Sequence, residues 1–339
     1  MNAGMSPRVS AGTSLRTSAR ARRAVPEDLI EVGMLGPAGA GKTSLVTSLY
    51  AQFPDVTRDL GLILRARDGL TSRILDRWRS DLERISREIV VREQGIPNTR
   101  ERRDLTFSLY RTGDGRDEPD RARLTFRFTD YPGGWLFEPT SADGEEAALR
   151  ARLRGSPFLF LAIDTPALLA DGGRWHHEFN APLAVRDLVL DWLDAPARRT
   201  LVLVPLKCER WCRGDDDVQR LIASVTEAYG HVLDPAARRQ STHVHVCPVQ
   251  TVGSLVFDRF ETEQNTPVSR YRGRSIGGGY HPHWTAEPLR LLVAGLLDEH
   301  LRARSWWEKV LEVFGRDADL RQALAVLATQ SYGPSERVV

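Results

Sequence analysis

The sequence predicts an α/β protein built as a three-layer sandwich, with a mostly parallel β-sheet between two layers of helices. Two observations predict this fold class. Short apolar runs alternate with helical patterns along most of the 339 residues, as in chains that form parallel sheets. The turn-rich stretch 113–120 separates two strand-like runs without a helix, which predicts one antiparallel hairpin strand. The expected strands cover 29–35, 105–110, 124–129, 158–163, 201–204 and 244–249.

The expected helices complete this alternation. A glycine-rich turn after the first strand leads into a helix from Lys42 to about Phe53. A long amphipathic helix is predicted over 68–91, because apolar side chains recur on one face at helical spacing. These side chains are Ile74, Leu75, Trp78, Leu82, Ile85 and Ile89. Further helical patterns lie near 144–153, 181–193 and 216–229, and two or three C-terminal helices are expected within 287–329.

These patterns predict one elaborated domain over residues 28–330, with a helical insertion at 55–98 and a C-terminal tail over 331–339. Residues 1–27 carry five arginines, many small residues and no acid before Glu27, which predicts a disordered basic tail. An organelle transit peptide has a similar composition and is the alternative for this segment.

Composition favours a soluble protein in a reducing compartment. Hydrophobic residues make up 41% and charged residues 27%, at a net charge of +2, whereas a nucleic-acid surface usually needs a concentrated basic excess. No apolar run approaches the roughly 18 residues of a membrane-spanning helix, so no integral membrane segment is expected. The three cysteines are too few for a disulfide framework and favour a cytoplasmic location.

A phosphate-binding loop is predicted directly after the first strand. Residues 36–43 fit the pattern G-x-x-x-x-G-K-[ST], and a helix follows, as this loop requires. Glycines let backbone N–H groups surround phosphates, while Lys42 would reach the β- and γ-phosphates and Thr43 would bind Mg²⁺. Only three of the 47 basic side chains are lysines, which favours a chemical need for this one. The sequence thus predicts a P-loop NTPase sandwich that binds nucleotide through Gly36, Pro37, Ala38, Gly39, Ala40, Gly41, Lys42, Thr43 and Ser44.

The segment after the strand 124–129 indicates the class of nucleotide-binding protein. Asp130 at the end of this strand is expected to hold Mg²⁺, often through water. Many P-loop ATPases place a second acid directly after this aspartate, but here Tyr131 follows. The form Asp-x-x-Gly is that of GTPases, in which the Gly133 N–H would sense the γ-phosphate. The alternative is an ordinary Asp-Pro-Gly turn.

A base-reading motif is expected at the end of the strand 201–204. In Asn-Lys-x-Asp loops the lysine stem lies along the guanine plane and the carboxylate accepts hydrogen bonds from the base. Lys207 and Glu209 have that spacing, although glutamate replaces aspartate and Leu206 stands in the asparagine position. Guanine is therefore favoured over adenine. A solvated Lys/Glu pair at a strand end is the alternative.

A switch threonine that closes on Mg²⁺ and the γ-phosphate is expected between the P-loop helix and Asp130. Thr99 is the preferred candidate for this metal-binding and catalytic role, because it lies in a turn-rich stretch before the strand 105–110. Thr57, Thr71 and Thr106 compete with it. The neighbouring Arg100, Arg102 and Arg103 are expected to be solvated, and a cation for the transition state is the alternative.

Together these motifs resemble the translation-factor-related (TRAFAC) class of P-loop GTPases. The string 130–136, Asp-Tyr-Pro-Gly-Gly-Trp-Leu, resembles a segment of bacterial YcjX-like GTPases. The strings 205–211 and 248–253 are similar to segments of bacterial double-GTPase families associated with conflict systems. The resemblance implies GTP and Mg²⁺ as ligands and a regulatory role. It also implies that Gln250 and Thr251 support the guanine.

One departure from the GTPase pattern bears on mechanism. Many GTPases carry a glutamine after the Asp-x-x-Gly glycine to orient the attacking water, and this chain has Gly134. Hydrolysis is then expected to be slow or stimulated by a partner. The prediction is a Mg²⁺-dependent GTP-binding switch with a protein effector or activator, in a bacterial conflict, defence or stress system. A nucleotide-binding scaffold without useful hydrolysis and a P-loop ATPase are the alternatives.

Overall fold

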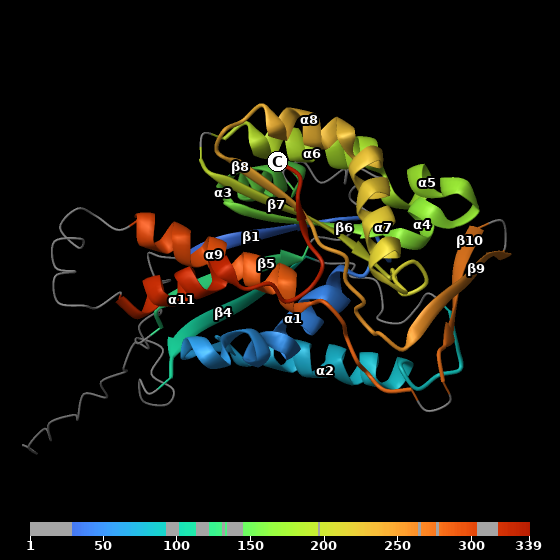
Figure 1. Ribbon diagram of the computed structural model, residues 1–339, viewed down its shortest axis with the longest axis horizontal. Helices are drawn as coiled ribbons and strands as arrows, with labels where there is room; N and C mark the ends of the chain where they lie inside the picture. Colours follow the sequence, from blue (N-terminus) through green and yellow to red (C-terminus); the bar gives the residue numbers. More distant parts are fainter. Residues whose placement is uncertain are drawn as a thin grey trace, which may run out of the picture.

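The computed structural model describes residues 29–92, 102–112, 122–130, 133, 145–195, 197–263, 266–275, 278–303 and 318–339. These residues form a main sheet of eight strands in the order β11-β8-β7-β6-β1-β5-β4-β2 (Figure 1). Five neighbouring strands are parallel: β1 (Leu29–Leu35), β5 (Leu124–Asp130), β6 (Phe158–Asp164), β7 (Arg199–Leu206) and β8 (Thr242–Val246). The antiparallel pairings lie at the two edges and involve β4 (Arg103–Arg111), β2 (Leu62–Ala66) and β11 (Glu336–Arg337).

Helices cover both faces of the sheet (Figure 1). One layer contains α1 (Lys42–Thr57), α2 (Gly69–Ile85), α9 (Ala286–Ala303) and α11 (Ala318–Thr329). The opposite layer contains α3 (Glu145–Gly155), α6 (Pro182–Leu193), α7 (Asp215–Ala228) and α8 (Gly230–Ala237). Between β6 and α6 lie α4 (Thr165–Leu169), the 3-10 turn η4 (Ala170–Gly173) and α5 (His176–Asn180). The predicted three-layer α/β sandwich and its hairpin strand are confirmed.

The two cores follow from the alternation of side chains along the buried strands. All seven residues of β6 are buried. Phe158 and Phe160 point into the core that contains α1 and α9, while Leu159 and Leu161 join the core beneath α6 and α7. A continuous apolar run is what a strand covered on both faces requires. This arrangement holds the carboxyl ends of the parallel strands at one edge, where ligands bind in open α/β sheets.

A second, three-stranded sheet has the order β3-β10-β9 and was not expected from the sequence. It consists of β3 (Val90–Arg92), β9 (Leu255–Glu263) and β10 (Thr266–Gly273), all antiparallel. Phe257 and Tyr271 form its small core with Leu255 and with Ile85 at the end of α2. In Figure 1 this sheet rises from the end of α2, at the side of the molecule where α4 and α5 also lie.

The predicted helical insertion over 55–98 is only partly helical. Gly61, at a left-handed φ of 63°, ends the first helical segment, and the apolar β2 then pairs with β4 at the sheet edge. The Asp68 side chain caps α2 by accepting a hydrogen bond from the Thr71 N–H at 2.7 Å. The helix stops at Ile85, so Ile89, predicted on its apolar face, is 62% exposed.

The C-terminal segment 331–339 belongs to the domain, so its prediction as a tail outside it is wrong. Its strand β11 pairs with the edge strand β8. Val338 and Val339 pack against the core of the α6 layer, and Tyr332 packs against the other core, because these apolar side chains lose contact with water there. The predicted N-terminal tail, 1–27, lies outside the described residues. Within the described part of the chain, no helix has the length and apolar character needed to cross a membrane.

Candidate nucleotide-binding site

The predicted phosphate loop lies between β1 and α1, at the carboxyl edge of the sheet. Gly36, Gly39 and Gly41 have positive φ angles of 143°, 76° and 103°. A Cβ atom at Gly36 would lie 2.7 Å from the Ala162 carbonyl oxygen, so both backbone conformation and space require glycine there. α1 begins at Lys42, directly after the loop, and the N-terminus of a helix can receive an anion.

Lys42 lies inside this loop. Its side chain is buried, and Nζ donates hydrogen bonds to the carbonyl oxygens of Gly36 at 2.7 Å and Pro37 at 2.9 Å. Burial lowers the pKa of Lys42 to about 8, while the charge of Asp130 acts in the opposite direction. An anion such as a polyphosphate would stabilise the charged form of this buried ammonium group.

Asp130 and Thr43 bring two hard oxygen donors together beside the loop. Asp130 ends β5 and pairs in register with Met34 of β1. Its Oδ2 accepts a hydrogen bond from Thr43 Oγ1 at 3.2 Å, and the aspartate is 1% exposed. A hydroxyl and a carboxylate fit Mg²⁺, which in nucleotide sites takes its other ligands from phosphate and water. Among the residues that the structure describes, no three His, Cys, Asp or Glu side chains gather as a metal site.

Gly133 packs directly on the phosphate loop. A Cβ atom at this position would lie 2.0 Å from Ala38 N and 2.3 Å from Pro37 C. Only glycine therefore permits this approach, and the backbone of Gly133 lies against the backbone of Pro37 and Ala38. Tyr131, Pro132 and Gly134 lie outside the described residues, and so does the predicted switch residue Thr99.

Two arginines next to the predicted switch are described. Arg103 begins β4, pairs in register with Asp130, and places its guanidinium 5.5 Å from the centre of the Trp78 ring on α2. Arg102 lies 3.6 Å from the Asp104 carboxylate, and Arg100 is outside the described residues. Arg103 is thus half-buried against a helix, unlike the solvated side chain that was expected.

Lys207 and Glu209 follow β7 at the same edge of the sheet. Lys207 has a left-handed φ of 58°, and its Nζ donates to Asp164 Oδ2 at 2.7 Å. Glu209 is 4% exposed and accepts a long hydrogen bond from the Gly253 N–H at 3.4 Å. Burial raises the pKa of Glu209 to about 7, although backbone hydrogen bonds and the charges of Arg274 and Lys207 act against this. The alternative of a solvated Lys/Glu pair is excluded by this burial.

Leu206, which stands in the asparagine position, makes an apolar contact with the phosphate loop. A Cβ atom at Gly41 would lie 3.4 Å from Leu206 Cδ1. The end of β7 therefore lies next to the start of α1. The base motif and the phosphate loop are neighbours in space.

Gln250 and Thr251 lie in the loop between β8 and β9, and both are buried. Gln250 exchanges backbone hydrogen bonds with His283, at 3.1 Å and 2.9 Å. Ser48 Oγ on α1 lies 2.7 Å from the Ser44 carbonyl oxygen and 3.1 Å from that of Thr251, so both oxygens are within reach of its single O–H donor. The structure thus joins this loop to the helix that follows the phosphate loop.

Sequence reasoning missed Asp164 as a member of this site. It ends β6, in register with Leu206 of β7, and is 2% exposed. The sequence does contain a signal for this residue. Asp164 is an acid at the carboxyl end of a parallel strand, and the carboxyl ends of such strands meet at one edge of the sheet.

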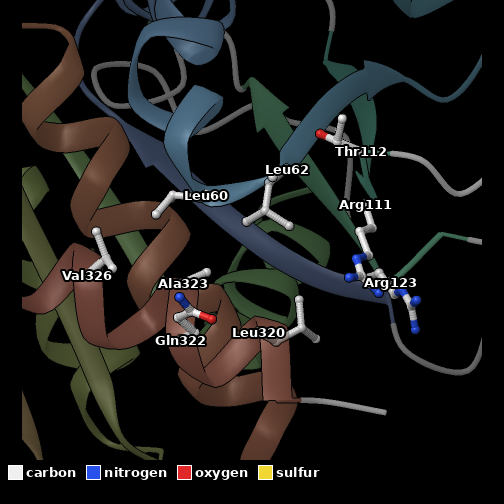
Figure 2. Close-up of a pocket in the computed structure, with 10 residues that line it drawn as sticks. Leu60, Leu62, Arg111, Thr112, Arg123, Leu320, Gln322, Ala323 and Val326 are labelled. Atoms are coloured by element: carbon white, nitrogen blue, oxygen red, sulfur yellow. The ribbon is translucent and has the colours of Figure 1, made fainter. Parts of the chain in front are cut away.

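The pocket in Figure 2 lies away from these loops. It measures about 290 Å³ and is formed by residues near the start of β2, the end of β4, the approach to β5 and α11, among them Leu62, Arg111, Arg123 and Ala323. Arg123 precedes β5, whereas Asp130 ends it, so the length of that strand, about 20 Å, separates the pocket from the predicted metal-binding aspartate.

Comparisons with known proteins give distant structural neighbours. No protein-family model and no curated protein sequence matches the chain. Among solved structures it is similar to the signal recognition particle receptor SRb-GTP/SRX complex from Chaetomium thermophilum, at 12% identity and a TM-score of 0.35, over 66% of this chain and 92% of that one. It is also similar to the GTPase-like domain of S. cerevisiae Ski7, bound to GTP or to GDP and inorganic phosphate.

The two Ski7 matches have identities of 13% and 14% and TM-scores of 0.37. Each covers 65% of this chain and, respectively, 42% and 43% of the Ski7 chain, which is less than half.

Proposed function

We propose that the chain is a GTP-binding protein that acts as a Mg²⁺-dependent regulatory switch, with hydrolysis that is slow or stimulated by a partner. One observation carries the proposal: a complete phosphate loop with a buried lysine lies at the same sheet edge as a buried carboxylate at the spacing of a guanine-reading motif. The first feature supports a polyphosphate ligand, and the second supports a base with hydrogen-bond donors.

At the phosphate end, the chain's own groups would stabilise negative charge. The loop N–H groups and the Lys42 ammonium would donate to phosphate oxygens, where the charge of the transition state is spread. Thr43 and Asp130 would hold Mg²⁺, directly and through water. A bound Mg²⁺ would neutralise phosphate charge. The Gly133 N–H, packed on Ala38, is the group proposed to sense the terminal phosphate.

At the base end, Glu209 would accept hydrogen bonds from the guanine N1 and N2 groups, while the Lys207 stem would lie along the base. A carboxylate has acceptors only, so it favours guanine over adenine, whose corresponding edge lacks the N2 donor. Gln250 and Thr251 would support the same ligand from the next loop.

The proposal of slow or assisted hydrolysis rests on Gly134, which has no side chain with which to orient water. A protein partner would then supply the missing group, as an effector or activator. The narrower placement among TRAFAC double-GTPase or YcjX-like proteins, in a bacterial conflict, defence or stress system, rests on the motif strings alone. A cytoplasmic location is part of the same proposal.

Two alternatives have specific support. Leu206 replaces the asparagine of the base motif, which favours a P-loop ATPase if base recognition is relaxed. The glycine in place of the water-orienting glutamine favours a nucleotide-binding scaffold that does not turn over usefully.

Single-turnover hydrolysis of GTP tests the switch against the scaffold. We expect slow turnover that requires Mg²⁺, is abolished in Lys42→Ala together with binding, and is reduced in Asp130→Asn. Asp104→Asn is a matched control, because Asp104 lies on the neighbouring strand β4 and pairs with Arg152. Tight binding without any Mg²⁺-dependent turnover would favour the scaffold instead.

A further inference from the structure

Two side chains outside the predicted GTPase motifs contact the Lys207 ammonium group. Its Nζ lies 2.7 Å from Asp164 Oδ2 and 5.6 Å from the centre of the Tyr271 ring. The lysine side chain is 15% exposed, so both contacts are made largely away from water. A carboxylate and an aromatic face are the two groups that bind an ammonium most strongly in such surroundings.

Asp164 is itself fixed before it meets the lysine. Its Oδ1 accepts a hydrogen bond from the Ala167 N–H at 2.9 Å, as the N-cap of α4. The Asn180 side chain binds both backbone groups of Asp164, accepting from its N–H at 2.8 Å and donating to its carbonyl oxygen at 3.0 Å. One carboxylate oxygen thus caps the helix α4, and the other binds Lys207.

Tyr271 comes from β10 of the second sheet. It is 8% exposed and contacts the Phe257 ring edge-on, with ring centres 5.8 Å apart. The loops that lead into and out of this hairpin also contact Glu209, because the Gly253 N–H donates to its side chain and Arg274 donates to its carbonyl oxygen at 3.1 Å. The second sheet therefore lies beside both side chains of the base motif.

We propose that Asp164 and Tyr271 are positioning residues that hold the Lys207 side chain in the conformation in which it receives a guanine base, so that the β3-β10-β9 sheet is part of the nucleotide site. The inference rests on the proposed function. A free lysine stem loses much rotamer freedom when a ligand orders it, and a stem that is already held avoids this loss on binding.

A mutant cycle on GDP affinity, measured by calorimetry with Mg²⁺, tests the positioning role. Asp164→Asn keeps an N-cap residue, and Tyr271→Leu removes the ring. Each is expected to weaken GDP binding about tenfold in the wild-type background and to have no further effect in Lys207→Ala. Tyr271→Phe keeps the aromatic face and should bind GDP like the wild type.

Wild-type affinity in both variants, or equal losses with and without Lys207, would overturn the proposal and leave a structural role only. A second measurement needs no nucleotide. It follows, by mass spectrometry, the rate at which an amine-reactive acylating reagent modifies Lys207. Asp164→Asn and Tyr271→Leu should each raise this rate severalfold in the nucleotide-free protein, and an unchanged rate would overturn the contact itself. Failure of the proposed function is distinct, because the wild type would then bind GDP no better than ADP, and Glu209→Gln would change neither.

Discussion

Gly133→Ala is the substitution whose effect follows most directly from the packing around the phosphate loop. The new Cβ atom would lie 2.0 Å from Ala38 N, whereas ordinary contact begins at 3.4 Å. The neighbouring atoms belong to the backbone of the phosphate loop and cannot rotate away. The two segments must therefore separate by roughly 1.4 Å. A displacement of about 1 Å can cost on the order of 100-fold in rate, or about 2.7 kcal/mol of transition-state stabilisation.

The assay is single-turnover GTP hydrolysis with saturating enzyme, so that affinity and rate are separated. We expect the rate to fall about 100-fold in Gly133→Ala. Gly155→Ala is the matched control, because Gly155 ends α3 and no atom lies within 4 Å of its Cβ position. It should leave turnover unchanged and stabilise the fold by about 0.4 to 1 kcal/mol, because alanine restricts the unfolded chain. Wild-type turnover in Gly133→Ala would refute the argument that close packing of this glycine on the loop is needed for activity.

Three further predictions concern single carboxylates. Asp130→Asn should weaken Mg²⁺-dependent GTP affinity at least about tenfold but leave affinity in a chelator nearly unchanged, as titration in both conditions would show. Wild-type GTP affinity should fall below pH 7, by up to about tenfold per pH unit, because Glu209, with a pKa of about 7, must lose its proton to bind guanine. Glu209→Gln should lose this part of the pH dependence, so its affinity should fall less steeply than that of the wild type in the same titration. Glu287 is buried and binds the Arg290 guanidinium and the Tyr332 N–H. Glu287→Gln should lower the free energy of unfolding by about 3 kcal/mol, which a thermal melt would show as a lower Tm.

Sequence reasoning succeeded where a few adjacent residues determine the local structure. The phosphate loop is specified by its own glycines, whose positive φ angles the structure shows. The buried strands were found because both of their faces are apolar, as in β6. The pairing of the runs 105–110 and 124–129 was predictable because the stretch between them is short and rich in turn residues.

Elements stabilised across the chain could not be predicted in this way. The β9-β10 hairpin carries charged side chains that pair across the strands, such as Arg270 with Glu261 at 2.6 Å, and this pattern does not indicate a strand in a single sequence. The C-terminal strand β11 has two residues and depends on the edge of β8. Asp164 and its partner Lys207 are 43 residues apart in the sequence, and only the pairing of β6 with β7 brings them together.

Nucleotide competition tests whether this site recognises guanine. Labelled GDP bound to the wild-type protein with Mg²⁺ would be displaced by unlabelled GTP or ATP, with Glu209→Gln measured alongside. We predict that GTP displaces the label at least about tenfold more effectively than ATP, and that Glu209→Gln removes this preference, since a bidentate acceptor for guanine is lost. Equal displacement by ATP, or a preference that survives Glu209→Gln, would contradict guanine recognition at this site.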